Sequence, residues 1–288
     1  MISMTHRRSS FRALLSSEGL AVAPGAYDAI SARLIEQAGF PLVYMTGAGV
    51  SAARGYPDYG LLTMSEMVDS ARVIARSVTT PVLADADTGY GNELNVTRSV
   101  REFEASGVAG IHLEDQVSPK RCGHLDGKDV IERDRFISLI RAAVAARQSD
   151  DFVIVARTDA VATKGLGEAI DRANEALAAG ADVAFVEALE SMEQVALVPR
   201  EVAGPCLLNV VPSGKTPVTD LNVAEELGYR IAICPGLLLG ATVLIGDGVL
   251  KDLESTRIHP GGGNPGSVGQ LFRRFGAEEW DWIRAGFT

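Results

Sequence analysis

The feature that most restricts the fold of this chain is a repeat of short apolar runs separated by longer amphipathic segments. Eight runs are nearly all apolar, which is typical of parallel strands that helices cover on both faces of a sheet. They occupy residues 20–24, 42–46, 81–85, 110–114, 152–158, 183–187, 206–211 and 230–234. Helical patterns lie between them, at residues 29–38, 63–77, 93–106, 133–147, 166–179, 192–202 and 220–227. The alternation predicts an α/β fold.

Glycine marks the ends of four predicted helices and supports a repeating unit. Gly39, Gly107, Gly180 and Gly228 each lead into the next apolar run, as the left-handed residue after a helix does. Eight such units in about 240 residues fit a (β/α)8 barrel. A doubly wound sheet is the alternative, but residues 24–28 (Pro-Gly-Ala-Tyr-Asp) are not a dinucleotide fingerprint. We therefore predict a (β/α)8 TIM-type barrel.

The barrel is predicted to form a single domain over residues 1–288, with a helical extension from about residue 240. Residues 261–265 (Gly-Gly-Gly-Asn-Pro) indicate a flexible turn, and they lack the Gly-Lys-Ser/Thr ending of a phosphate loop. Trp280 and Trp282 follow in a last helix. Residues two apart do not share a helix face. We therefore expect one tryptophan to pack outside its own barrel, with a neighbouring subunit as the candidate surface.

Charge and cysteine usage exclude several classes of protein. A formal net charge of −10 argues against proteins that bind nucleic acid or membrane surfaces through basic stripes. Three cysteines, Cys122, Cys206 and Cys234, are too few for a disulfide framework and fit a reducing compartment. The first 15 residues contain no apolar stretch typical of a signal peptide. The predicted location is the cytoplasm, and Cys206 and Cys234 are predicted to be inert core residues.

Polar residues stand at the carboxyl ends of six consecutive predicted strands. In a barrel these ends meet at one face, which is where active sites lie. A lone carboxylate after a strand is usually a helix N-cap, and that interpretation fits Asp115 or Asp159 taken singly. Six consecutive polar ends are harder to explain by capping and predict a site. They are residues 44–49, 85–87, 112–115 and 157–159, Glu187 and Asn209.

The carboxylates in this set indicate a metal site. Asp85, Asp87 and Glu114 offer the hard oxygen ligands that suit Mg²⁺ or Mn²⁺. A plain turn is the alternative for Asp87, because Thr88 and Gly89 follow it. Zinc is not indicated, since no second Cys/His pair has zinc-binding spacing.

The most reactive composition lies after the fourth run, in residues 118–124 (Ser-Pro-Lys-Arg-Cys-Gly-His). Lys120 and Arg121 can pair with substrate carboxylates, although a solvated basic pair is the plainer interpretation. A free thiol has a pKa of about 8.5, and nearby cations lower it. Flanked by Arg121 and His124, Cys122 is predicted to exchange a proton near neutral pH.

Residues 120–124 resemble the signature loop of the isocitrate lyase/phosphoenolpyruvate mutase superfamily. The similarity extends through residues 44–49, 55–58, 85–91, 111–116 and 156–159 and Asn209. The resemblance implies a barrel whose C-terminal helices are swapped between subunits of a dimer or tetramer. It also implies Mg²⁺ at Asp85 and Asp87, with Asp58 and Glu114 in the outer shell. The 2-oxo or 2-hydroxy acid group would lie on the backbone of Thr46, Gly47 and Ala48.

The cysteine narrows the implied activity. Lyases of the superfamily that release a dicarboxylate resemble this chain in having it, whereas the phosphonate mutases and decarboxylases generally lack it. The resemblance thus implies a Mg²⁺-dependent carbon–carbon lyase of the 2-methylisocitrate or 2,3-dimethylmalate type, with Cys122 as general acid–base. The implied catalytic group also contains Tyr44, Asp58, Lys120, Arg121 and His124, and the implied substrate contacts are Gly123, Arg157, Glu187 and Asn209. The base stays open among Tyr44, Asp58 and a metal-bound water.

Two segments depart from the family pattern and keep alternatives open. Thr46-Gly47-Ala48 replaces the usual Ser-Gly-Gly. Residues 210–217 are closer to the dimethylmalate lyase and oxaloacetate hydrolase branch than to methylisocitrate lyases. The alternative enzymes are therefore an oxaloacetate hydrolase or decarboxylase and a phosphonate-processing member. A barrel that binds a dicarboxylate without catalysis is the alternative outside enzymes.

Overall fold

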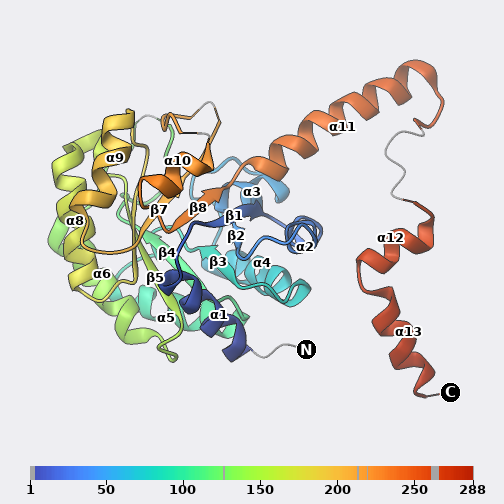
Figure 1. Cartoon of the computed structure of the whole chain (residues 1–288), viewed down its shortest axis with the longest axis horizontal. Coiled ribbons are helices and arrows are strands. Elements are labelled where there is room, and N and C mark those ends of the chain that lie inside the picture. The colour runs from blue at the N-terminus through green and yellow to red at the C-terminus, as the bar shows by residue number, and fades with distance from the viewer. Residues whose placement is uncertain (1–3, 126, 213, 219, 261–265, 288) are drawn as a thin grey trace. The chain divides into compact units, whose positions relative to one another are not determined.

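A computed structural model describes residues 4–125, 127–212, 214–218, 220–260 and 266–287. The chain divides into two compact units, Met1–Leu238 and Leu239–Thr288. The first unit contains a closed barrel of parallel strands that follow one another in chain order (Figure 1). The strands are β1 Ala21–Ala26, β2 Val43–Met45, β3 Val82–Asp85, β4 Gly110–Glu114, β5 Val153–Thr158, β6 Val183–Val186, β7 Cys206–Asn209 and β8 Ile231–Cys234.

Pairing of the first strand with the last closes the barrel, with Ala21 opposite Ile231. The predicted (β/α)8 barrel is therefore confirmed, and a doubly wound sheet, which has two open edges, is excluded. All seven predicted helices are present: α2 Ala29–Gln37, α4 Met64–Ser77, α5 Glu93–Ser106, α6 Arg133–Ala146, α8 Leu166–Ala178, α9 Met192–Glu201 and α10 Leu221–Glu226. The four glycines predicted to end helices all have positive φ angles, from 84° at Gly39 to 105° at Gly180.

Three helices of the first unit were not predicted: α1 Met4–Ser16, α3 Gly47–Ala53 and α7 Val161–Lys164. Helix α1 fills the amino end of the barrel. Phe11 is fully buried among apolar side chains of the strands, and its ring approaches Gly110 at the start of β4. Arg12 donates to Asp182 at 2.5 Å, just before β6. With this end filled, a ligand has to enter at the carboxyl ends of the strands.

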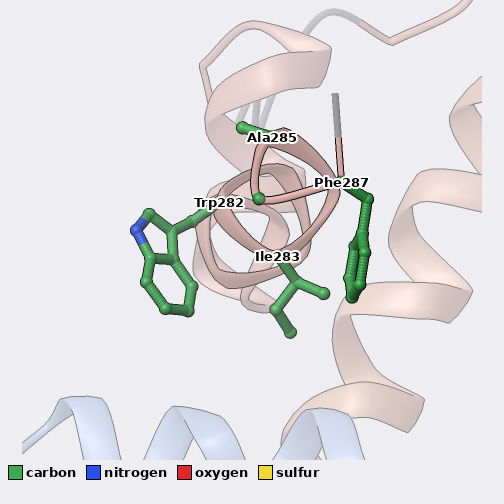
Figure 2. Close-up of a pocket in the computed structure, with 5 residues that line it drawn as sticks. Trp282, Ile283, Ala285 and Phe287 are labelled. Atoms are coloured by element: carbon green, nitrogen blue, oxygen red, sulfur yellow. The ribbon is translucent and has the colours of Figure 1, made fainter.

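The second unit contains the rest of α11 (Leu237–Thr256), then α12 (Val268–Arg274) and α13 (Ala277–Ala285). In none of these three helices is a described residue buried. Figure 2 shows Trp282, Ile283 and Phe287 spread outward around the end of α13, where they line an apolar hollow. Trp280 and Trp282 are both exposed. The turn predicted at residues 261–265 lies outside the described residues.

Among the helices in the described part of the chain, none combines the length and the apolar character needed to span a bilayer.

Candidate active site

A cavity of about 150 Å³ lies at the carboxyl ends of the strands. Eleven residues singled out from the sequence line it: Tyr44, Thr46, Ala48, Asp58, Asp85, Cys122, Gly123, His124, Arg157, Glu187 and Asn209. Val211, Pro235 and Gly236 complete the lining. Val211 comes from the segment of residues 210–217 that departs from the family pattern, and the other two were not expected. Gly47, Asp87, Glu114, Lys120 and Arg121 are not part of it, although the first four lie close by.

Asp85 ends β3 and is held by two backbone donors. Gly47 N donates to Asp85 Oδ2 at 3.2 Å, and Asp87 N donates to Oδ1 at 2.9 Å. A β-carbon at Gly47 would lie 2.4 Å from Asp85 Oδ2, so only glycine allows this approach. Asp87 lies in the predicted turn, with φ at 46° and Gly89 N donating to Ala86 O at 3.0 Å. The turn and the carboxylate cluster are therefore both present.

The donor set suits a divalent cation. Glu114 ends β4, and neither of its buried oxygens accepts a hydrogen bond from the described residues. Arg157 Nη1 lies 3.1 Å from Oε2 and offsets part of the cost of burying this carboxylate. Burial raises the pKa of Glu114 well above its usual range, and the nearby Asp159 and Asp85 add to the rise. In the described part of the chain no three His, Cys, Asp or Glu side chains could enclose a metal ion by themselves. A cation here would complete its shell from water and substrate, as Mg²⁺ commonly does.

Tyr44 is placed to orient the cluster. Its hydroxyl lies 2.8 Å from His112 Nε2 and 3.4 Å from Asp85 Oδ2. Burial and the charge of Asp85 raise the pKa of Tyr44 well above its usual value. The phenol therefore stays protonated at neutral pH, which weakens Tyr44 as a candidate base. His112 is buried in β4, and its sequence position predicted only that it lies at a strand end.

Lys120 and Arg121 are adjacent in the loop, but their side chains have different surroundings in the structure. Lys120 Nζ lies 2.5 Å from Asp58 Oδ1 and 2.9 Å from Asp87 Oδ1. Burial alone would lower its pKa, but Asp87, Asp85 and Glu114 raise it well above the usual value. Arg121 is exposed, and its guanidinium lies 5.9 Å from the centre of the Tyr59 ring. Lys120 thus binds the carboxylate cluster, and the solvated interpretation holds for Arg121.

The Cys122 thiol faces the cavity, and its pKa is raised, whereas the sequence predicted that it would be lowered. Burial raises its pKa and the charge of Asp58 adds to the rise, while the backbone N–H of His124 only partly offsets them. The expected lowering by flanking cations fails because Arg121 is turned outward. The neutral thiol is the form that a proton donor needs.

The pH dependence of alkylation at Cys122 tests this direction. The thiolate, not the thiol, attacks iodoacetamide, and a raised pKa leaves less thiolate at any given pH. We expect the midpoint of the rate against pH to lie above that of glutathione, measured by peptide mass spectrometry in the same buffers. A midpoint at or below that of glutathione would show that the cavity stabilises the thiolate.

Arg157, at the end of β5, is the central cation of the opposite wall. Its Nη1 lies 3.1 Å from Glu114 Oε2, its Nε 2.9 Å from Asp159 Oδ2, and its Nη2 3.8 Å from Glu187 Oε1. Burial would lower the pKa of Arg157, but these carboxylates raise it well above its usual value. The guanidinium carbon also lies 5.2 Å from the centre of the Phe185 ring. Arg157 is thus a fixed positive charge beside the cavity.

His124 joins the loop to the last strands. Lys215 N donates to His124 Nδ1 at 3.1 Å, so Nε2 carries the proton of the neutral ring. That nitrogen lies 3.3 Å from Glu187 Oε1, which also accepts from Asn209 Nδ2 at 3.1 Å. Burial lowers the pKa of His124, and the ring is therefore neutral at pH 7.

The interpretation of Asp115 and Asp159 as helix N-caps is wrong, because both carboxylates accept hydrogen bonds from other segments. Asp115 accepts from Thr158 Oγ1 at 2.6 Å, Asp159 N at 2.8 Å and Arg172 Nη1 at 3.0 Å. Asp159 accepts from Arg157 and from Lys128 Nζ at 2.8 Å. Asp115 therefore joins the end of β4 to the end of β5 and to α8, and Asp159 joins β5 to the loop after β4. Lys128 was not predicted as a site residue, because a lysine after a loop glycine is ordinarily exposed.

Three comparisons bear on this site. A family described as phosphoenolpyruvate phosphomutase matches residues 11–251. The chain is 48% identical over 228 residues to a 2,3-dimethylmalate lyase of Eubacterium barkeri, covering 79% of each chain. It is 44% identical over 257 residues to a probable 2-methylisocitrate lyase of Corynebacterium glutamicum, covering 89% of this chain and 84% of that one. The structure of an oxaloacetate acetylhydrolase with 3,3-difluorooxalacetate superposes with a TM-score of 0.93 at 39% identity, covering 97% and 96% of the two chains.

Proposed function

Because the chain belongs to the phosphoenolpyruvate mutase/isocitrate lyase superfamily and is a carbon–carbon lyase like its named relatives, we propose that it cleaves a 2-hydroxy di- or tricarboxylate. The proposed substrate is of the 2,3-dimethylmalate or 2-methylisocitrate type, and one product is a 2-oxo acid such as pyruvate. The observation that carries the proposal is that the Cys122 thiol lines the same cavity as the charged side chains of Asp85 and Arg157.

Ala48, Val211 and Pro235 are apolar residues of the cavity lining and support a substrate with methyl substituents. Apolar groups are favoured beside such residues because both lose contact with water. We favour 2,3-dimethylmalate, because it carries two methyl groups and two carboxylates, whereas 2-methylisocitrate carries one methyl group and three carboxylates. The segment of residues 210–217 that indicated this branch contributes Val211 to the lining, while its Ser213 lies outside the described residues.

Asp85 and Asp87, with Glu114 beside them, would hold a divalent cation, which we take to be Mg²⁺ with Mn²⁺ as the alternative. When bound, the ion supplies positive charge at the 2-hydroxy-carboxylate end of the substrate. Arg157 would bind the far carboxylate, where negative charge grows as the bond breaks. With Tyr44 protonated and Lys120 held on Asp58, Asp58 is the candidate base that remains among the side chains.

The proposed reaction moves one proton off the substrate and returns one to it. Loss of the 2-hydroxyl proton lets C2 become a carbonyl while the C2–C3 bond breaks. The electron pair of that bond passes to the far carboxylate, giving an aci-carboxylate beside Arg157. The Cys122 thiol then donates its proton to C3 and is left as a thiolate. The sulfur recovers a proton from water or the base before the next turnover.

A substrate panel tests the proposed function. Purified enzyme with Mg²⁺ is expected to release pyruvate and propionate from 2,3-dimethylmalate, or pyruvate and succinate from 2-methylisocitrate, with no turnover in excess chelator. Product formation is followed by NMR. Oxalate and acetate formed from oxaloacetate would favour the hydrolase instead. The structural similarity to oxaloacetate acetylhydrolase is the reason to include this alternative. Binding of dicarboxylates without any product would favour a non-catalytic role.

We also propose a cytoplasmic homo-oligomer, a dimer or tetramer, in which Leu239–Thr288 is a helical extension of one barrel domain. The support is the exposure of large apolar side chains in the second unit, among them Leu244, Ile245, Leu250, Trp282 and Phe287. Exposed large apolar side chains gathered in one segment commonly mark a protein interface, and a second copy of the chain is the partner that the family resemblance suggests. Cell fractionation checks the location.

Leu244→Asp is expected to lower the oligomeric mass measured by sedimentation equilibrium, because a carboxylate is costly in an apolar interface. The matched control is Leu94→Asp in α5, since Leu94 is 78% exposed and Leu244 is 76% exposed. The control should keep the mass of the unaltered protein. An unchanged mass for Leu244→Asp would remove Leu244 from the interface.

A further inference from the structure

Lys128 is a buried lysine in the loop after β4. Its side chain is 1% exposed, and the side chain of Asp159 is fully buried. An ammonium group is expensive to bury unless it is paired and hydrogen-bonded. Lys128 meets both requirements, because Nζ donates to the backbone oxygen of Gly123 and to Asp159 Oδ1.

The first partner ties Lys128 to the catalytic segment of the loop. Gly123 lies between Cys122 and His124, and it rests directly on the far wall of the cavity. A β-carbon at this position would lie 2.2 Å from Glu187 Oε1 and 2.5 Å from Arg157 Nη2. The distance from Gly123 to this wall therefore sets how far Cys122 reaches into the cavity, and Lys128 holds the carbonyl that defines it.

The second partner ties the same ammonium group to the substrate-binding arginine. Asp159 receives Arg157 Nε at 2.9 Å and Arg157 Nη2 at 3.3 Å. Its backbone N–H donates to Asp115 Oδ1 at 2.8 Å, which fixes the carboxylate to the barrel. Lys128 and Arg157 thus share one carboxylate whose own position does not depend on the loop.

We propose that Lys128 is a positioning residue that latches residues 120–124: it holds the Gly123 carbonyl, and with it Cys122, at the cavity, and through Asp159 it fixes the orientation of Arg157. Without the ammonium group, the Gly123 carbonyl would lose this donor, and Asp159 would keep Arg157 as its one cation among the described contacts. The latch therefore favours the arrangement in which Cys122 faces the cavity before substrate arrives.

The reactivity of Cys122 tests the latch without any assay of activity. In Lys128→Met, the rate of iodoacetamide reaction at Cys122 is expected to rise by about 10- to 100-fold, the range for losing a hydrogen bond to a charged group. Cys206, buried in β7, reports global opening in the same sample and should stay unreactive. Lys164→Met, at an exposed lysine in α7, is the matched control. Lys128→Arg keeps a cation and should restore part of the protection.

The kinetic readout rests on the proposed lyase reaction. When the held arrangement of residues 120–124 is less populated, apparent affinity falls in proportion, so Lys128→Met should raise KM by about the same 10- to 100-fold and change kcat much less. Unchanged labelling of Cys122 would overturn the latch, and so would equal acceleration at Cys122 and Cys206, since Lys128 would then support the whole fold. Faster labelling in a protein that cleaves no panel substrate would keep the latch and reject the proposed function.

Discussion

Cys122→Ala is expected to lower kcat by about 10²–10⁴-fold, the usual contribution of a general acid. Alanine removes the one thiol that lines the cavity and leaves the aci-carboxylate without its proton donor. Among the described residues, no hydrogen bond joins the Cys122 side chain to the carboxylate cluster. The affinity of the enzyme for Mg²⁺ should therefore be unchanged. Steady-state kinetics and calorimetric titration with Mg²⁺ measure the two quantities.

The matched control for this variant is Cys206→Ala, which removes a thiol at the opposite, amino-terminal end of β7. It should retain normal kcat for the folded enzyme. Near-normal turnover in Cys122→Ala would remove the thiol from the reaction. A fall in Mg²⁺ affinity equal to the fall in turnover would assign Cys122 to the metal site instead.

Arg157→Met is expected to lower the free energy of unfolding by about 3–5 kcal/mol, the cost of leaving buried charges without their partner. Glu114, Asp159 and Glu187 all lie within 4 Å of this guanidinium, and each is buried. Urea unfolding at fixed protein concentration measures the change. Turnover should fall as well, because the far carboxylate of the substrate loses its cation.

Arg133→Met is the matched control, because Arg133 has the same number of carboxylate partners as Arg157 but is less buried. Arg133 also pairs with three carboxylates, Glu168, Asp171 and Glu175, but it lies at the surface. Solvent screens such pairs, so its loss should cost about 1 kcal/mol or less. Equal losses in the two variants would mean that burial of Arg157 contributes nothing to its effect.

The barrel was predictable because each strand is covered on both faces, whereas each outer helix is covered by the barrel on one face. These two patterns, continuous apolar runs and a 3.6-residue period, are visible in sequence. The polar, arginine-bearing segment of α1 shows neither pattern clearly, since much of its contact with the barrel is made by Phe11 and by arginines. Helix α3 follows β2 at once in a glycine-rich stretch that indicates a loop, and Thr46, its N-cap, was the one signal for it.

The site was predictable in its residue types and less so in its connections. Strand ends converge in a barrel, so Asp85, Arg157, Glu187 and Asn209 could be grouped from sequence. Lys120 and Arg121 are adjacent, and no local pattern shows that one turns to the carboxylates and the other to Tyr59. The pKa of Cys122 depends on burial by distant segments, which spacing along the chain does not report.

The filling of the barrel floor by α1 has a consequence for how the chain folds as it leaves the ribosome. Arg12 and its partner Asp182 are 170 residues apart in sequence, and Ala21 pairs with Ile231 in the last strand. Contacts between such distant segments form slowly. We expect the first helix to remain undocked until β6 has emerged, so a protease should cut α1 in nascent chains stalled before Asp182 and spare it in longer ones. Equal protection at both lengths would show that α1 docks on an incomplete barrel.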